Sequence, residues 1–152
     1  MALVASEITA RLIIVAQFPA LRGSQFEITS EATTVYNCIA WAAGDTDKFW
    51  WPGHFWPRSV GRNVTRESFV KAFQSRGYAV CDSPGAEASF EKIALYEHNG
   101  TPTHAARLLP NGRWSSKLGR SHDISHPLEG LNGDQYGSPV LFMKRKVVDA
   151  AA

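Results

Sequence analysis

One cysteine and one histidine, far apart in the chain, are the residue types that nucleophilic catalysis requires. Cys38 opens the segment Cys38–Ala43 (CIAWAA), which is predicted to be a short buried helix ended by Gly44. A helix N-terminus lowers the pKa of a thiol, because its unpaired N–H groups favour the thiolate. His104 opens a predicted strand and would lie at a sheet rim. We therefore expect Cys38 to be a nucleophile and His104 its general base.

A third residue is expected to orient the imidazole of His104. Asp123 and His126 lie in the segment SHDISH, which follows the last predicted hairpin. We expect Asp123 in this role, because a carboxylate both orients an imidazole and stabilises an imidazolium; His126 is the alternative. The N–H group of Cys38 would bind an oxyanion together with a donor from Tyr36 or Asn37.

Each of these residues also has a purely structural interpretation. Cys38 has apolar neighbours and would serve as a buried structural cysteine. His104 would be a strand histidine bonded to a backbone carbonyl, and Asp123 a loop residue or helix cap. The other cysteine, Cys81, precedes Asp82, whose charge disfavours a thiolate.

Composition places the chain among ordinary globular domains. It has 152 residues, 44% hydrophobic and 20% charged, so we expect one domain over residues 1–152 that needs no disulfide, metal or cofactor. A net charge of +2 is too small to indicate a nucleic-acid partner. The apolar run Leu12–Ala16 is too short to span a membrane. The expected location is the cytoplasm, or delivery without a cleaved signal peptide.

The elements that must position these residues change in type along the chain. Ser6 is predicted to cap a helix running to about Val15, and Thr65 to cap a helix over Arg66–Arg76. After Gly77 the pattern is that of strands, with a hairpin signal at Asn99-Gly100. The predicted strands are Tyr78–Cys81, Lys92–Glu97, Thr103–Leu109, Arg113–Lys117 and Pro139–Arg145, and residues 25–30 form an extended lead-in. Helices followed by an antiparallel meander predict the α+β class.

Two further segments have candidate binding roles. Trp50, Trp51 and Trp56 lie in FWWPGHFWP and would form an aromatic wall for substrate beside the nucleophile, or a loop packed into the core. His122 and His126 are four residues apart, which is ligand spacing for a metal if that segment is helical. Arg107 would bind a substrate carboxylate if it points to the cleft.

The longer strings resemble a known family. YNCIAWA at Tyr36–Ala42, WWP, KIALY, THAAR, WSSKLG and DISH resemble an uncharacterised bacterial domain family placed near the papain-like, NlpC/P60-type cysteine peptidases. This resemblance implies a papain-like α+β fold, with N-terminal helices packed on an antiparallel β-meander. It implies that Cys38 is the nucleophile and His104 the base. It places the third member near Ser116 or Lys117.

These observations together predict a cysteine hydrolase that acts on an amide bond, a peptidase or amidase, through a Cys-His-Asp triad and a thioacyl-enzyme. The substrate would be a peptide or protein, with cell-wall peptide as one option. A toxin or effector role would bring an immunity or inhibitor protein as partner. Deamidation and transamidation use the same acyl-enzyme and stay open. The remaining alternatives are a metal hydrolase and a non-catalytic binding module that uses the Trp-rich loop.

Overall fold

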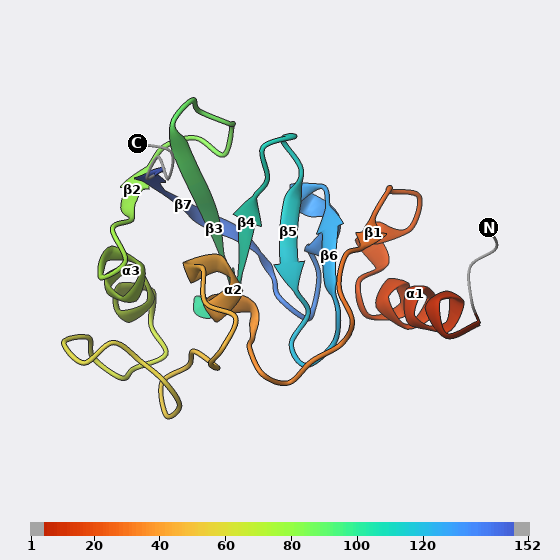
Figure 1. Ribbon diagram of the computed structural model, residues 1–152, viewed down its shortest axis with the longest axis horizontal. Helices are drawn as coiled ribbons and strands as arrows, with labels where there is room; N and C mark the ends of the chain where they lie inside the picture. The colour runs from red at the N-terminus through yellow and green to blue at the C-terminus, as the bar shows by residue number, and fades with distance from the viewer. Residues whose placement is uncertain (1–4, 148–152) are drawn as a thin grey trace.

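A seven-stranded sheet forms the centre of the computed structural model, which describes residues 5–147 (Figure 1). All strand pairs are antiparallel, and the spatial order is β1-β6-β5-β4-β3-β7-β2. The strands are β1 (Glu27–Ile28), β2 (Ala79–Cys81), β3 (Phe90–His98), β4 (Thr101–Leu108), β5 (Trp114–Lys117), β6 (Asp123–His126) and β7 (Ser138–Lys146).

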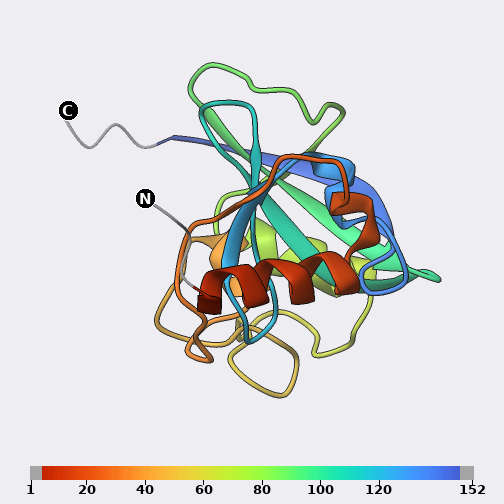
Figure 2. The same ribbon diagram turned by 90° about the vertical axis from the view of Figure 1, so that its right-hand side faces the viewer.

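Helical segments cover both faces of this sheet and create two apolar cores. The helices are α1 (Ala5–Gln17), α2 (Cys38–Ala43) and α3 (Arg66–Gln74), with 3₁₀ turns η1 (Pro19–Leu21) and η2 (Leu128–Leu131). The α1 core joins residues of α1, η1 and η2 to one sheet face, and Figure 2 shows α1 lying across that face. The α2 core joins α2, α3 and the Trp-rich loop to the other face. None of the described helices is long and apolar enough to cross a lipid bilayer.

The predicted boundaries of α2 are confirmed, and the caps explain why. The Asn37 side chain accepts hydrogen bonds from the N–H groups of Ala40 and Trp50, at 3.2 and 2.9 Å. Gly44 ends the helix in the left-handed region, at φ 96°, where a side chain would be strained. Six residues between two strong caps form a short helix that places Cys38 at its first turn.

The strand predictions after residue 77 are confirmed to within a few residues, and so is the hairpin at Asn99-Gly100. These two residues have φ values of 52° and 80°, as the tight turn between β3 and β4 requires. The predicted helix capped by Thr65 is also present; its hydroxyl accepts from the Ser68 N–H.

The papain-like α+β prediction is wrong, because residues 5–147 form mainly a seven-stranded antiparallel sheet with only three short helices. Two segments interpreted as a lead-in and a loop supply strands β1 and β6, which pair with each other at one sheet edge. The last strand does not continue the meander. β7 returns between β3 and β2 and pairs with both of them.

Strands β4 and β5 diverge soon after their hairpin, and this divergence positions the candidate site. Their register contains only Arg107↔Ser115 and Leu108↔Trp114. Beyond these pairs, the β5 side of β4 has no paired strand among the described residues from Ala106 back to Thr101. The polar backbone groups on that side of β4 must therefore be satisfied by something other than a sheet ladder.

Substituting Gly137 by alanine is expected to destabilise the fold more than the same change at Gly112. Both glycines have positive φ, 75° and 84°, so alanine costs roughly 1–2 kcal/mol of backbone strain at either site. At Gly137 the new Cβ would also overlap the backbone carbonyl of Glu97, adding roughly 1–3 kcal/mol, whereas Gly112 has open space around it. Urea unfolding of both variants measures the difference, and equal losses would contradict the packing at Gly137.

Candidate functional site

The thiol of Cys38 is buried at the start of α2 and faces β4. Its residue is 6% exposed and belongs to the α2 core together with Ala105. The backbone groups of Ala105, Ile39 and Cys38 itself lie near enough to the sulfur to oppose the rise in its pKa. Since β4 has no strand paired with it on that side at Ala105, the thiol occupies the space where β4 and β5 separate.

Burial dominates the acidity of this thiol. Desolvation raises the pKa of Cys38 to about 11, against the opposing influence of the surrounding N–H groups and of the Lys117 charge. The expectation of a thiol with lowered pKa is therefore wrong for this conformation, because the loss of water outweighs the N–H groups of a short helix. Cys38 is a neutral thiol at pH 7.

His104 precedes Ala105 in β4, but its imidazole lies on the α1 side of the sheet. It pairs across the strands with Tyr96, at 5.1 Å between ring centroids, and stacks on Tyr136 at 4.0 Å. Side chains alternate along a strand, so Ala105 faces Cys38 while His104 faces the α1 core. Among the described residues, the thiol of Cys38 and the imidazole of His104 share no hydrogen bond. The backbone of Ala105, the residue after His104, lies near the sulfur.

A serine and a second histidine, Ser116 and His126, form a buried chain of polar contacts with His104. His104 Nε2 lies 2.9 Å from Ser116 Oγ, which lies 2.7 Å from His126 Nε2. His126 Nδ1 lies 2.7 Å from the Pro127 carbonyl oxygen. All three side chains in this chain, which we call the His104 relay, belong to fully buried residues.

The Pro127 carbonyl sets the direction of every proton in the relay. A carbonyl only accepts, so Nδ1 of His126 carries a proton. Burial lowers the pKa of His126 to about 4, so its other nitrogen is unprotonated at neutral pH and accepts from the Ser116 hydroxyl. Ser116 then accepts from Nε2 of His104. The proton of neutral His104 is thus on Nε2, and its Nδ1 keeps a free lone pair.

That Nδ1 is a buried nitrogen for which the described residues provide no hydrogen-bond partner. Desolvation, reinforced by the neighbouring His126, lowers the pKa of His104 well below its usual value, so the ring is neutral at pH 7. A buried acceptor without a hydrogen bond lowers the stability of the fold by about 1–3 kcal/mol. Such unsatisfied groups often have a catalytic role. The relay therefore presents an unprotonated base one residue along β4 from Ala105, which packs in the α2 core with Cys38.

Asp123 does not contact the imidazole, so the predicted Cys-His-Asp arrangement is not formed in this conformation. Asp123 pairs with Lys117 across β5 and β6, and its Oδ2 accepts a 2.8 Å hydrogen bond from Tyr36. Ser116 precedes Lys117 in β5, so its side chain faces the opposite side of the sheet, toward α1. Alternation along β5 and β6 therefore places Ser116 and His126 beside His104, and Asp123 on the Cys38 side.

The two expected oxyanion donors are already engaged. Tyr36 donates to Asp123, and the Asn37 amide nitrogen donates to the Trp50 carbonyl at 2.7 Å. The backbone N–H groups near the sulfur, those of Cys38 and Ala105, are better candidates for this role.

The Trp-rich loop packs inward rather than forming an open wall. Trp50 and Trp56 are 0% and 3% exposed and contact each other with centroids 6.4 Å apart. Trp51 is half-buried and packs edge-on against Phe69 of α3. The predicted substrate wall is therefore mostly core in this conformation, because indole rings fill the space between α2 and α3.

The metal alternative fails on the geometry of β6. His126 ends this strand and His122 immediately precedes it; four residues along an extended chain span about 13 Å, too far for two ligands of one ion. Within residues 5–147 no three His, Cys, Asp or Glu side chains converge as metal ligands would. His122 is instead bonded to the Ser30 carbonyl, at 3.0 Å.

The fold and the site define a class of protein: an antiparallel-sheet domain with a buried thiol and a histidine relay on opposite sides of one strand. The model of a domain of unknown function, DUF7689, matches residues 27–144, and the chain belongs to this family. The match includes the whole candidate site, whereas α1 precedes it. The resemblance to an uncharacterised family is thus confirmed, but nothing in the comparisons links it to papain-like peptidases. No curated protein and no solved structure matches the chain.

The titration of Cys38 is expected to follow its burial. In a Cys81→Ser variant, the rate of Cys38 alkylation by iodoacetamide should increase about tenfold per pH unit through neutral pH and level off only near pH 11, because the thiolate is the reacting species. The rate is followed by mass spectrometry, with urea-unfolded protein as the control. A midpoint near 8.5 in the folded protein would contradict a desolvated thiol.

Proposed function

We propose that the protein is a cysteine hydrolase that cleaves an amide bond through a thioacyl-enzyme on Cys38, with His104 as the general base. The observation that supports it most directly is the unpartnered Nδ1 of His104, left unprotonated by the relay and one residue from Ala105, which packs in the same core as the thiol. The proposal shares with papain-like peptidases the chemistry of a thiol and an imidazole, and not their fold.

The proposed reaction starts from two neutral groups. The thiol and Nδ1 of His104 share no hydrogen bond in the resting protein, so the proposal requires substrate binding to bring them together. The sulfur of Cys38 then bonds to the carbonyl carbon of the substrate as its S–H proton moves to Nδ1 of His104. The tetrahedral intermediate collapses when the C–N bond breaks and the amine leaves with that proton. Water then attacks the thioester, gives one proton to Nδ1, and releases the carboxylic acid while the proton returns to the sulfur.

The two ends of the relay support this proposal in different ways. Ser116 and His126 hold the tautomer of His104 that can accept a proton at Nδ1, and they supply hydrogen bonds that follow the charge as imidazolium forms. The N–H groups of Cys38 and Ala105 lie near the sulfur and are suited to bind an oxyanion on the carbon attached to it. Serine and histidine thus replace the carboxylate expected from the sequence.

The raised pKa of Cys38 and the lowered pKa of His104 have a mechanistic consequence. Because the proton strongly prefers sulfur in the resting protein, no thiolate–imidazolium pair accumulates before substrate binds. Proton transfer must accompany attack, when negative charge moves from the sulfur to the carbonyl oxygen. A small exposed fraction of Cys38 favours a slender acyl chain as substrate.

Replacing Cys38 by alanine is expected to abolish amide cleavage while preserving the fold. The assay incubates the protein with a proteome-derived peptide library and uses mass spectrometry to detect new chain ends, deamidated side chains and an acyl adduct on Cys38. Hydroxylamine should release the adduct, because thioesters are cleaved by this nucleophile. Cys81→Ser is the matched control. Activity that persists in the Cys38 variant with native circular dichroism would refute the proposal.

Ser116→Ala is expected to lower kcat about 10- to 100-fold, because it breaks the hydrogen-bond chain that fixes the tautomer of His104. Ser115→Ala is the matched control: its hydroxyl lies on the opposite face and accepts from the Trp41 indole at 3.1 Å. Steady-state kinetics on a substrate found in the library measure both variants. Equal rates in the two variants would contradict a catalytic relay.

A further inference from the structure

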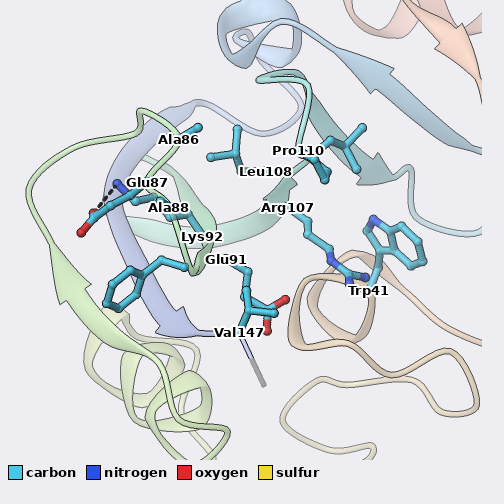
Figure 3. A pocket seen from close by; sticks show the side chains of 12 residues that line it. Trp41, Ala86, Glu87, Ala88, Glu91, Lys92, Arg107, Leu108, Pro110 and Val147 are labelled. Carbon is cyan, nitrogen blue, oxygen red and sulfur yellow. Dashed lines mark ion pairs between the residues drawn. The ribbon is translucent and has the colours of Figure 1, made fainter. Parts of the chain in front are cut away.

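A cavity of about 620 Å³ lies beside α2, on the same face of the sheet as Cys38 (Figure 3). It is bordered by Trp41 of α2, Arg107 of β4, the β2–β3 connection and the β4–β5 turn. Its volume lies within the usual range for small-molecule sites. Most of its lining is apolar, including Phe90, Leu108 and Pro110.

Arg107 is the distinctive polar group of this cavity. Its guanidinium carbon lies 4.9 Å from the ring centre of Trp41, so the planar group is held against an aromatic ring. Within the part of the chain that the structure describes, the guanidinium has neither a hydrogen bond nor an ion pair. Contact with the ring occupies one side of the planar group and leaves its N–H groups free to donate.

The carboxylates at the cavity wall already have partners. Glu87 pairs with Lys144 at 2.8 Å and with Lys92 at 3.3 Å, while Glu91 pairs with Arg145. Four cations, with Arg107 included, thus stand against two carboxylates. One of the two excess positive charges is shared by the two lysines at Glu87, and the other lies at Arg107, where it favours a negatively charged group.

We propose that this cavity recognises the carboxylate of a partly apolar ligand, with Arg107 as the bidentate donor. The planar guanidinium fork matches a planar carboxylate, and the surrounding side chains match a hydrocarbon or aromatic body. A singly charged carboxylate suits the site better than a phosphate dianion, because Arg107 supplies one unpaired positive charge, whereas Lys92, Lys144 and Arg145 are engaged with Glu87 and Glu91.

The position of the cavity links this site to the proposed reaction. Trp41 follows Cys38 by three residues, about one helical turn, and Arg107 follows Ala105 by two residues on the same face of β4. Cys38 itself does not line the cavity, so a substrate that uses both sites would contact Arg107 with its carboxylate and reach past Trp41 to the thiol. That the cavity binds a carboxylate does not depend on the proposed function. That the substrates of the enzyme carry this carboxylate rests on the proposed function.

Binding is tested on the full chain carrying Cys38→Ala, so that no probe can be consumed. Titration calorimetry with benzoylglycine and with benzoylglycinamide compares a carboxylate with a neutral group on the same body. We expect benzoylglycine to bind at least tenfold more tightly, and this preference to decrease with added salt. Arg107→Gln should abolish the preference, and Arg107→Lys should retain part of it. Arg62→Gln, at an exposed position outside the cavity, is the matched control.

Equal affinity for the two probes, or a preference that survives Arg107→Gln, would overturn the carboxylate site. Tighter binding of phenyl phosphate than of benzoylglycine would overturn the choice of a monoanion. In the active chain, Arg107→Gln should raise KM for acidic substrates with little effect on kcat. Binding that behaves as expected, together with no hydrolytic activity in the unsubstituted chain, would refute the proposed function alone and support the cavity as a binding site.

Discussion

The hydrogen bond from His126 to the Pro127 carbonyl determines the chemistry of the buried centre. Because a carbonyl can only accept, this one contact fixes the tautomer of His126, then the direction of the Ser116 hydroxyl, then the tautomer of His104. The three buried side chains satisfy one another except at the last atom, Nδ1 of His104. A structural histidine at this position would be expected to have both nitrogens satisfied.

The divergence of β4 from β5 allows Nδ1 of His104 to be considered together with the thiol of Cys38. A fully paired β4 would place the N–H of Ala105 in a ladder and separate the thiol from the histidine by an unbroken sheet. The short register instead leaves space in which the start of α2 meets the strand edge. Burial of apolar surface around α2 offsets the cost of enclosing these polar groups, since Ile39, Ala40 and Ala42 are fully buried there.

Local signals in the sequence predicted the elements well and the pairing between them poorly. Asn37, Gly44 and the Asn99-Gly100 turn act on neighbouring residues, so α2 and the β3–β4 hairpin could be located from sequence. β6 could not, because His122, Asp123 and Pro127 give it no clear alternation and its pairing with the two-residue β1 is non-local. Misreading β6 as a loop allowed Asp123 to be assigned to His104. The His104 relay depends on the pairing of β5 with β6, which places His126 beside Ser116, so it could not be predicted without that strand.

The alternation of side chains along a strand explains why proposed catalytic and binding groups can share one short segment. Along β4, His104 faces the α1 core, whereas Ala105 and Arg107 face α2 and the cavity. A base, a thiol contact and an anion-binding group are therefore encoded within four consecutive residues, His104 to Arg107. Each is held by a different layer: Tyr136 stacks on the base, and Trp41 on the guanidinium. A shift of β4 by one residue would exchange the two faces and remove both sites together.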